Sequence, residues 1–165
     1  MTEGASVMVV DDEPLQLAGM VRLLENNGYA VTAAKTGREC LAKVNVSRPA
    51  LILLDVMLPD INGLEVCSRI KSDPDLRESF SVIISGHKIS ALDRRDGLTV
   101  GGDFYLTRPI SNQAILFNVA SLMQIHENRR FLHNERNSLA KELQQYKREI
   151  TRMKAAMKKS VGGQE

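Results

Sequence analysis

Residues 51–63 read LILLDVMLPDING, an apolar run that stops at Asp55 and continues into a turn and a helix signal. A second run, VMVV at residues 7–10, stops at Asp11 and Asp12 in the same way. A buried parallel strand that ends in aspartate places its carboxylate at the carboxyl edge of the sheet, where open α/β sheets bind ligands. Three carboxylates that meet there repel one another unless a hard divalent cation lies between them. We therefore expect Mg²⁺ at this edge and chemistry on a phosphoryl group, with one aspartate as the acceptor.

Short apolar runs alternate with helix-period segments along the first two thirds of the chain. The strands predicted from these runs are Val7–Val10, Tyr29–Ala33, Leu51–Leu54, Ser81–Ile84 and Phe104–Leu106. The helices predicted between them are Pro14–Asn26, Gly37–Asn45, Leu64–Lys71 and Ile89–Leu98. Strands that alternate with helices indicate a parallel sheet, and continuous apolar runs indicate strands that are covered on both faces. We expect an α/β fold, a doubly wound five-stranded parallel sheet, over residues 1–120.

The segment from residue 111 to residue 160 contains neither Gly nor Pro, and its apolar residues recur every three or four positions. Such a 3.5-residue repeat, sustained over about five heptads, predicts a coiled coil that continues the last helix of the domain. We assign it to residues 121–160 and expect a flexible tail at 161–165. Heptad position a holds Leu122, Arg129, Arg136, Leu143, Ile150 and Met157, and position d holds Ile125, Leu132, Leu139, Tyr146 and Met153.

A single helix with so narrow an apolar stripe is poorly stable by itself, so the pattern implies a partner helix. Arg129 and Arg136 at position a disfavour higher oligomers, because their charged heads must reach water. A parallel homodimer is the favoured arrangement.

The composition sets limits on the class of protein. The chain has 165 residues, is 43% hydrophobic and carries a formal net charge of +2, which is too small to imply a nucleic-acid partner by itself. The segment 129–159 holds ten Lys or Arg against three Glu, but this charge is spread along the heptads, so nucleic-acid binding is not favoured. With no signal peptide, no apolar run of membrane-spanning length and two unpaired cysteines, Cys40 and Cys67, we expect a cytoplasmic protein without a membrane span.

The first 110 residues resemble the receiver domain of two-component response regulators. Four ordered segments carry the resemblance: the acidic pair Asp11-Asp12, the segment LLDVMLPDINGLE that contains Asp55, the Ser85-Gly86 pair, and GGDFYLTRPI at residues 101–110. The resemblance implies the flavodoxin-like (βα)₅ receiver fold. It also implies that a histidine kinase or a phosphotransfer protein is the partner.

Roles at the acidic cluster are carried over from the resemblance. Asp55 matches the phosphoacceptor, a carboxylate nucleophile that forms an acyl phosphate. Asp12 matches the direct ligand of Mg²⁺ and Asp11 the acid that holds the ion through water, while the backbone carbonyl of Met57 matches a further oxygen ligand. Asp11 has an alternative interpretation as the N-cap of the helix that begins near Pro14.

The resemblance also assigns a switch and exposes one departure. Ser85 matches the hydroxyl that binds a phosphoryl oxygen, and Tyr105 matches the aromatic residue that changes rotamer as that hydroxyl moves. Receivers normally carry lysine where this chain has Arg108, and a planar, bulkier guanidinium is not equivalent to a compact ammonium. Two interpretations stay open: phosphorylation is retained with altered rate or switching, which we favour, or the domain no longer signals by phosphate.

The predicted function is a phosphorylation-controlled signalling module, not an enzyme with ordinary turnover. Phosphate on Asp55 would rearrange the face around residues 104–107 and, through the last helix, change the pairing of the coiled coil. The signal would pass from the coiled coil to an output domain if the chain is a fragment of a longer protein. A stand-alone adaptor and an unphosphorylated scaffold that acts through coiled-coil dimerisation are the alternatives.

Overall fold

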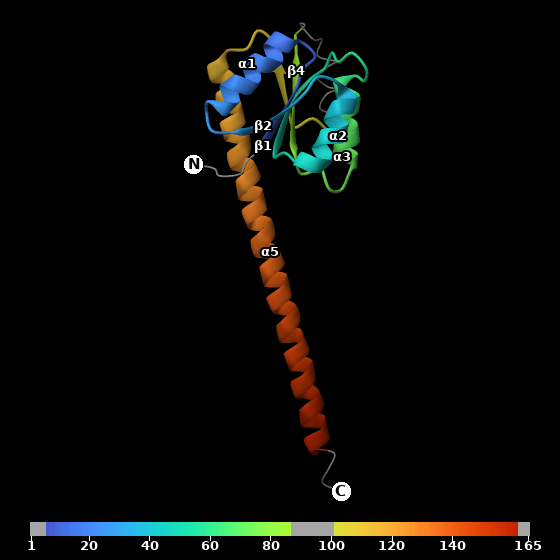
Figure 1. The fold of residues 1–165 in the computed structure, drawn as a ribbon. Helices are drawn as coiled ribbons and strands as arrows, with labels where there is room; N and C mark the ends of the chain where they lie inside the picture. Colours follow the sequence, from blue (N-terminus) through green and yellow to red (C-terminus); the bar gives the residue numbers. More distant parts are fainter. Residues whose placement is uncertain (1–5, 87–100, 162–165) are drawn as a thin grey trace. The chain divides into compact units, whose positions relative to one another are not determined.

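The computed structural model describes residues 6–86 and 101–161, with side-chain positions up to residue 158. Within these ranges five parallel strands form one sheet, in the order β2-β1-β3-β4-β5 (Figure 1). The order reverses between β1 and β3, so the carboxyl ends of these two strands lie at the topological switch point where such sheets bind ligands. The strands are β1 (Ser6–Val10), β2 (Ala30–Ala34), β3 (Leu51–Asp55), β4 (Phe80–Ser85) and β5 (Phe104–Thr107).

Helices cover both faces of the sheet, as predicted for a doubly wound fold. One core joins α1 and the first turns of α5 to alternate residues of the strands, and the other joins α2 and α3 to the opposite face. The central strands β1, β3 and β4 are buried almost throughout, which explains their continuous apolar sequence. The helices are α1 (Pro14–Glu25), α2 (Gly37–Ser47), α3 (Gly63–Ser72) and α5 (Asn112–Val161).

The predicted elements agree with the structure to within one or two residues at each end. The second strand begins at Ala30 instead of Tyr29, because the turn before it extends to Gly28, whose φ of +87° is a left-handed conformation that glycine adopts readily. The helix predicted at Ile89–Leu98 lies outside the described residues. The α/β class, the five parallel strands and the extended last helix are confirmed.

Helix α5 is one continuous helix of 50 residues, but it belongs to two units of the chain, residues 1–126 and 127–165. In the first unit, Leu122 and Met123 are buried in the core beside α1. The first predicted position a, Leu122, is therefore occupied by the domain core and is not free for a coiled coil. Beyond it, every described residue from 127 to 158 is exposed. None of the helices in the described part of the chain combines the length and apolar character that crossing a bilayer requires.

Candidate functional site

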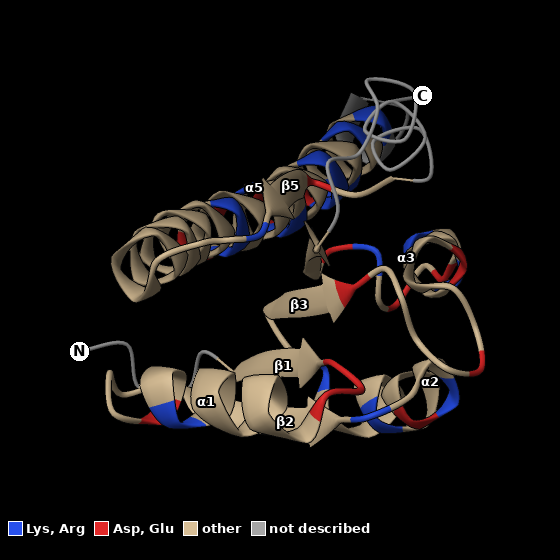
Figure 2. Ribbon diagram, turned by 90° about the horizontal axis from the view of Figure 1, so that it is seen from above, with Lys and Arg blue, Asp and Glu red and all other residues tan. Residues whose placement is uncertain are grey.

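The three predicted aspartates meet at the carboxyl edge of the sheet. Asp11, Asp12 and Asp55 each place a carboxylate oxygen within 4.8 Å of an oxygen of the other two. Figure 2, seen from above, marks the acidic positions at the ends of β1 and β3 in red. The sequence prediction that these residues converge is confirmed by this geometry.

The register of the sheet explains why Asp11 and Asp55 are neighbours. Val10 at the end of β1 pairs with Leu54 in β3, so the next residue of each strand is an aspartate. Asp11 is held by its backbone N–H, which donates to the carbonyl of Ala34 (3.1 Å), and by its Oδ1, which accepts from the N–H of Glu13 (2.9 Å).

The alternative interpretation of Asp11 as a helix N-cap is wrong. The N-cap of α1 is Glu13, which makes no side-chain capping bond, and the helix begins at Pro14. The Asp11 side chain instead closes a short turn before the helix. Its other oxygen, Oδ2, points into the acidic cluster, where it meets Arg108.

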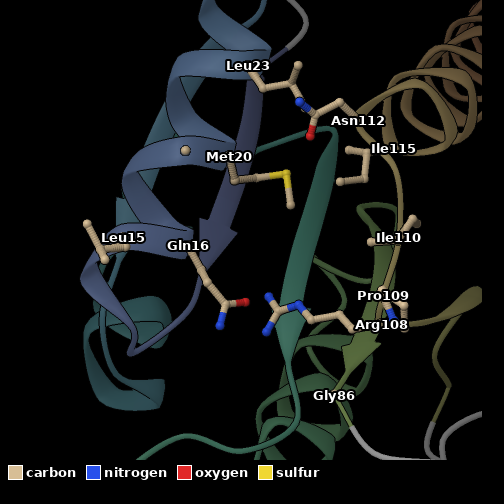
Figure 3. A pocket seen from close by; sticks show the side chains of 11 residues that line it. Leu15, Gln16, Met20, Leu23, Gly86, Arg108, Pro109, Ile110, Asn112 and Ile115 are labelled. Atoms are coloured by element: carbon tan, nitrogen blue, oxygen red, sulfur yellow. The ribbon is translucent and has the colours of Figure 1, made fainter.

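Arg108 is the cation of the cluster. It follows β5, and its backbone N–H donates to the carbonyl of Ser85 (2.8 Å). Its guanidinium donates from Nη2 to Oδ2 of Asp11 (2.5 Å) and places Nη1 3.6 Å from Oδ2 of Asp55. Figure 3 shows the guanidinium reaching from the end of β5 toward Gln16 of α1. One planar fork therefore spans two carboxylates, a geometry that a lysine ammonium does not reproduce.

The electrostatics of the cluster act on Asp55. Burial raises the pKa of this carboxyl above its ordinary value of 3.8; the charge of Arg108 opposes the rise and the charge of Asp11 adds to it. Asp55 is only 7% exposed and Asp11 only 3%, whereas Asp12 is exposed to solvent. Two buried, adjacent carboxylates thus favour any additional cation that can approach from the side of Asp12.

Of the other predicted site residues, Ser85 and Met57 lie near Asp55, and Tyr105 lies further along β5. Ser85 is buried at the end of β4, the strand next to β3. Met57 is exposed, and its backbone N–H lies 3.5 Å from Oδ1 of Asp55, at the limit of a hydrogen bond. Tyr105 lies in β5 against the core formed with α2 and α3, and its buried hydroxyl has no hydrogen-bond partner among the described residues.

Two residues that sequence reasoning treated only as turn chemistry support the acceptor. Gly63, the first residue of α3, lies so close to β3 that a Cβ there would come within 2.0 Å of the backbone oxygen of Asp55. Asp60 lies in the same loop, and its carboxylate accepts from the N–H groups of Gly37 and Arg38 at the start of α2 (2.8 and 2.9 Å). The loop after Asp55 is therefore fastened to a second helix. The DING motif at residues 60–63 is the signal that could have indicated this.

Known proteins are similar to the part of the chain that contains this site. A family model for the response regulator receiver domain matches residues 7–120. The probable transcriptional regulatory protein TcrX of Mycobacterium tuberculosis is 38% identical over 120 residues, which are 72% of this chain and 50% of TcrX. The alkaline phosphatase synthesis transcriptional regulatory protein PhoP of Bacillus subtilis is 34% identical over 121 residues, 73% of this chain and 49% of PhoP. The chain thus spans about half the length of the curated relatives it matches.

Solved structures agree with the fold. A CheY-like response regulator receiver domain protein from Methanospirillum hungatei aligns with a TM-score of 0.71 and 26% identity, over 75% of this chain and 97% of that one. The chemotaxis response regulator CheY4 of Vibrio cholerae aligns with a TM-score of 0.67 and 25% identity, over 72% and 98%.

The close approach of Gly63 to β3 generates a stability prediction. Gly63→Ala forces α3 away from the Asp55 backbone, so we expect a loss of about 2–4 kcal/mol in the free energy of unfolding, as for other severe steric conflicts. Gly19→Ala in α1 is the matched control, because a Cβ there meets nothing within 4 Å. It should stabilise the protein by about 0.5–1 kcal/mol, the usual gain in a helix interior. Equal urea midpoints for the two variants would contradict the packing argument.

The raised pKa of Asp55 generates a prediction about pH. A carboxyl whose pKa is higher in the folded state favours folding below the unfolded value of 3.8 and loses that contribution as pH rises through the folded value. The free energy of unfolding of Asp55→Asn, relative to that of the unaltered protein, should therefore increase as the pH rises from 3.5 to 7. Urea unfolding at both pH values measures this difference.

Asp60→Asn is the control of opposite sign. Hydrogen bonds from backbone N–H groups, that of Arg38 first, lower the pKa of Asp60 to about 2, so its ionised form favours folding above pH 3.8. This variant should lose stability at neutral pH, and the difference should shrink as pH falls toward 2. A loss of stability at pH 7 in Asp55→Asn would show that the ionised carboxylate of Asp55 does not destabilise the folded protein.

Proposed function

This chain belongs to the response regulator receiver family of two-component signalling proteins, and from that membership we propose that Asp55 accepts a phosphoryl group from a histidine kinase or a phosphotransfer protein. The observation that carries the proposal is the position of Asp55, a buried carboxylate at the switch point of the sheet, beside two further acids and one arginine. The cytoplasmic location expected from the sequence is part of the same proposal.

The proposed step is a transfer between two nucleophiles. An oxygen of the Asp55 carboxylate forms a bond to phosphorus while the bond from phosphorus to the donor's imidazole nitrogen breaks, and its electron pair stays on that nitrogen. The product is an acyl phosphate on Asp55. Among the described residues, Arg108 places its guanidinium 3.6 Å from Asp55, where it can stabilise negative charge on the transferred group.

The acidic cluster also fits Mg²⁺. This ion prefers carboxylate and water oxygens and binds through few protein ligands together with a phosphate, which matches two buried acids and one exposed acid. Asp12, Asp11 and Asp55 would hold it, with the backbone carbonyl of Met57 as the further ligand that the family resemblance implies. When bound, the ion neutralises charge on the acceptor and on the phosphoryl oxygens.

Arg108 gives this chain its own version of the site. The guanidinium already bridges Asp11 and Asp55, so it contacts the same carboxylate oxygens that a divalent cation would use. We infer that Arg108 supports phosphorylation but slows it or weakens its coupling to the switch at Ser85 and Tyr105. The buried, unpartnered hydroxyl of Tyr105 is consistent with a residue that gains a partner in another rotamer.

The proposed output is helix α5. Its exposed apolar positions pair with a second chain as a coiled coil, and phosphate on Asp55 changes that pairing through β5 and the start of α5. The named relatives TcrX and PhoP are transcriptional regulators, and this chain matches about half of each. An output of another kind, an adaptor role or a further domain is compatible with the same receiver.

The test is intact mass of the full chain after incubation with phosphoramidate and Mg²⁺. We expect a gain of one phosphoryl group that is lost in Asp55→Asn and retained in Asp75→Asn, whose exposed carboxylate lies outside the acidic cluster. Arg108→Lys should be phosphorylated faster, because a compact ammonium on a flexible stem does not hold the two carboxylates in the fixed geometry of the guanidinium fork. The absence of any mass gain in a folded protein would contradict the proposal and favour an unphosphorylated scaffold that acts through its coiled coil.

A further inference from the structure

The exposed part of α5 presents an apolar seam that Arg136 alone interrupts between Leu132 and Met157. From Leu132 to Met157 the residues at positions a and d, arginine apart, are between 51% and 67% exposed in the single chain. A seam of this kind is buried when a second helix packs against it. The seam residues are Leu132, Leu139, Leu143, Tyr146, Ile150, Met153 and Met157.

Charged residues flank the seam with one sign on each side. Position g holds only acids where it is charged, and position e holds only lysines where it carries full charge. The acids at g are Glu135, Glu142 and Glu149, and the lysines at e are Lys147 and Lys154. A helix that merely needs to be soluble has no reason to separate the two signs in this way, because mixed charges at both flanks would serve equally well.

We propose that residues 132–157 pair with the same residues of a second copy, parallel and in register, and that the flanking charges select this orientation. The inference rests on the dimeric coiled coil of the proposed function and adds its geometry. In a parallel pair, position g of one helix faces position e of the next heptad in the other helix. Glu142 then meets Lys147 of the second copy, and Glu149 meets Lys154, twice each by symmetry.

The antiparallel alternative places like charges together. In that arrangement g faces g and e faces e, so Glu142 and Glu149 oppose glutamates instead of lysines. Among the described residues of the single chain, Glu142, Lys147 and Lys154 form no ion pair. Glu149 accepts a hydrogen bond from the side chain of Gln145 (3.3 Å) and forms no ion pair there.

The arginines point to the same orientation. A parallel, in-register pair puts Arg129 against Arg129 and Arg136 against Arg136, where each Arg136 also has Glu135 of the other copy nearby. Every layer from Leu139 to Met157 is then apolar. An antiparallel pair over the same residues 132–157 would instead set Arg136 against Met153 and interrupt the apolar layers near both ends. The parallel pair is therefore least stable where the arginines lie, next to the receiver, and most stable beyond Leu139.

Charge reversal in the full chain tests this geometry, with sedimentation equilibrium as the readout. Glu142→Lys with Glu149→Lys turns every g-to-e contact repulsive in the parallel pair, and we expect the dissociation constant to rise at least about tenfold. The fourfold swap, which adds Lys147→Glu and Lys154→Glu, restores opposite charges at the same net charge and should dimerise like the unaltered chain. An antiparallel pair predicts no weakening in either variant, because lysine against lysine or lysine against Glu135 replaces glutamate against glutamate at the g positions.

Mixing and cross-linking separate the remaining outcomes. A mixture of the unaltered chain with the fourfold swap should sort into like pairs; mixed dimers would indicate antiparallel pairing and overturn the inference while leaving the proposed dimer intact. Leu139→Cys and Met153→Cys should each form a disulfide with its own copy, since the native Cys40 and Cys67 are fully buried. A chain that stays monomeric at every concentration would overturn the coiled coil itself, whereas phosphorylation of Asp55 is measured separately by mass.

Discussion

Two buried carboxylates held side by side at the end of neighbouring strands are the constraint on which the site depends. The register of β1 and β3 makes Asp11 and Asp55 neighbours, and burial raises the pKa of Asp55. A protein that places two acids in this way must supply positive charge to them. Among the described residues, the guanidinium of Arg108 supplies this positive charge; it comes from the end of a third strand and spans both acids.

This constraint explains the neighbouring architecture. Gly63 lets α3 begin directly against the backbone of Asp55, and Asp60 fastens the intervening loop to the start of α2. Both contacts fix the backbone around the acceptor, so that the carboxylate is held by packing and by hydrogen bonds on elements outside the charged cluster. The proposed chemistry depends on this arrangement, since an acceptor that could turn away from the edge of the sheet would relieve its own repulsion.

The sequence predicted the parts of this site that follow from strand patterns. A parallel strand has one carboxyl end, so an aspartate after an apolar run can be placed at the edge of the sheet without knowledge of the side-chain contacts. The contacts of Asp60 with α2, the tight approach at Gly63 and the fork of Arg108 depend on loop geometry, and residue patterns do not encode that geometry. The heptad pattern likewise predicted one long helix, but it could not reveal that Leu122 is used by the domain core. A periodic apolar residue looks the same in either environment.

The measurement that tests this account most directly is a calorimetric titration of the full chain with Mg²⁺ at neutral pH. We expect one saturable site, lost in Asp12→Asn and tighter in Arg108→Lys, because a flexible lysine side chain moves aside more easily than the guanidinium fork that bridges Asp11 and Asp55. Equal affinity in the unaltered chain and in Arg108→Lys would show that the guanidinium does not compete for these oxygens. Titration without saturable binding would contradict the claim that the three carboxylates form a cation site.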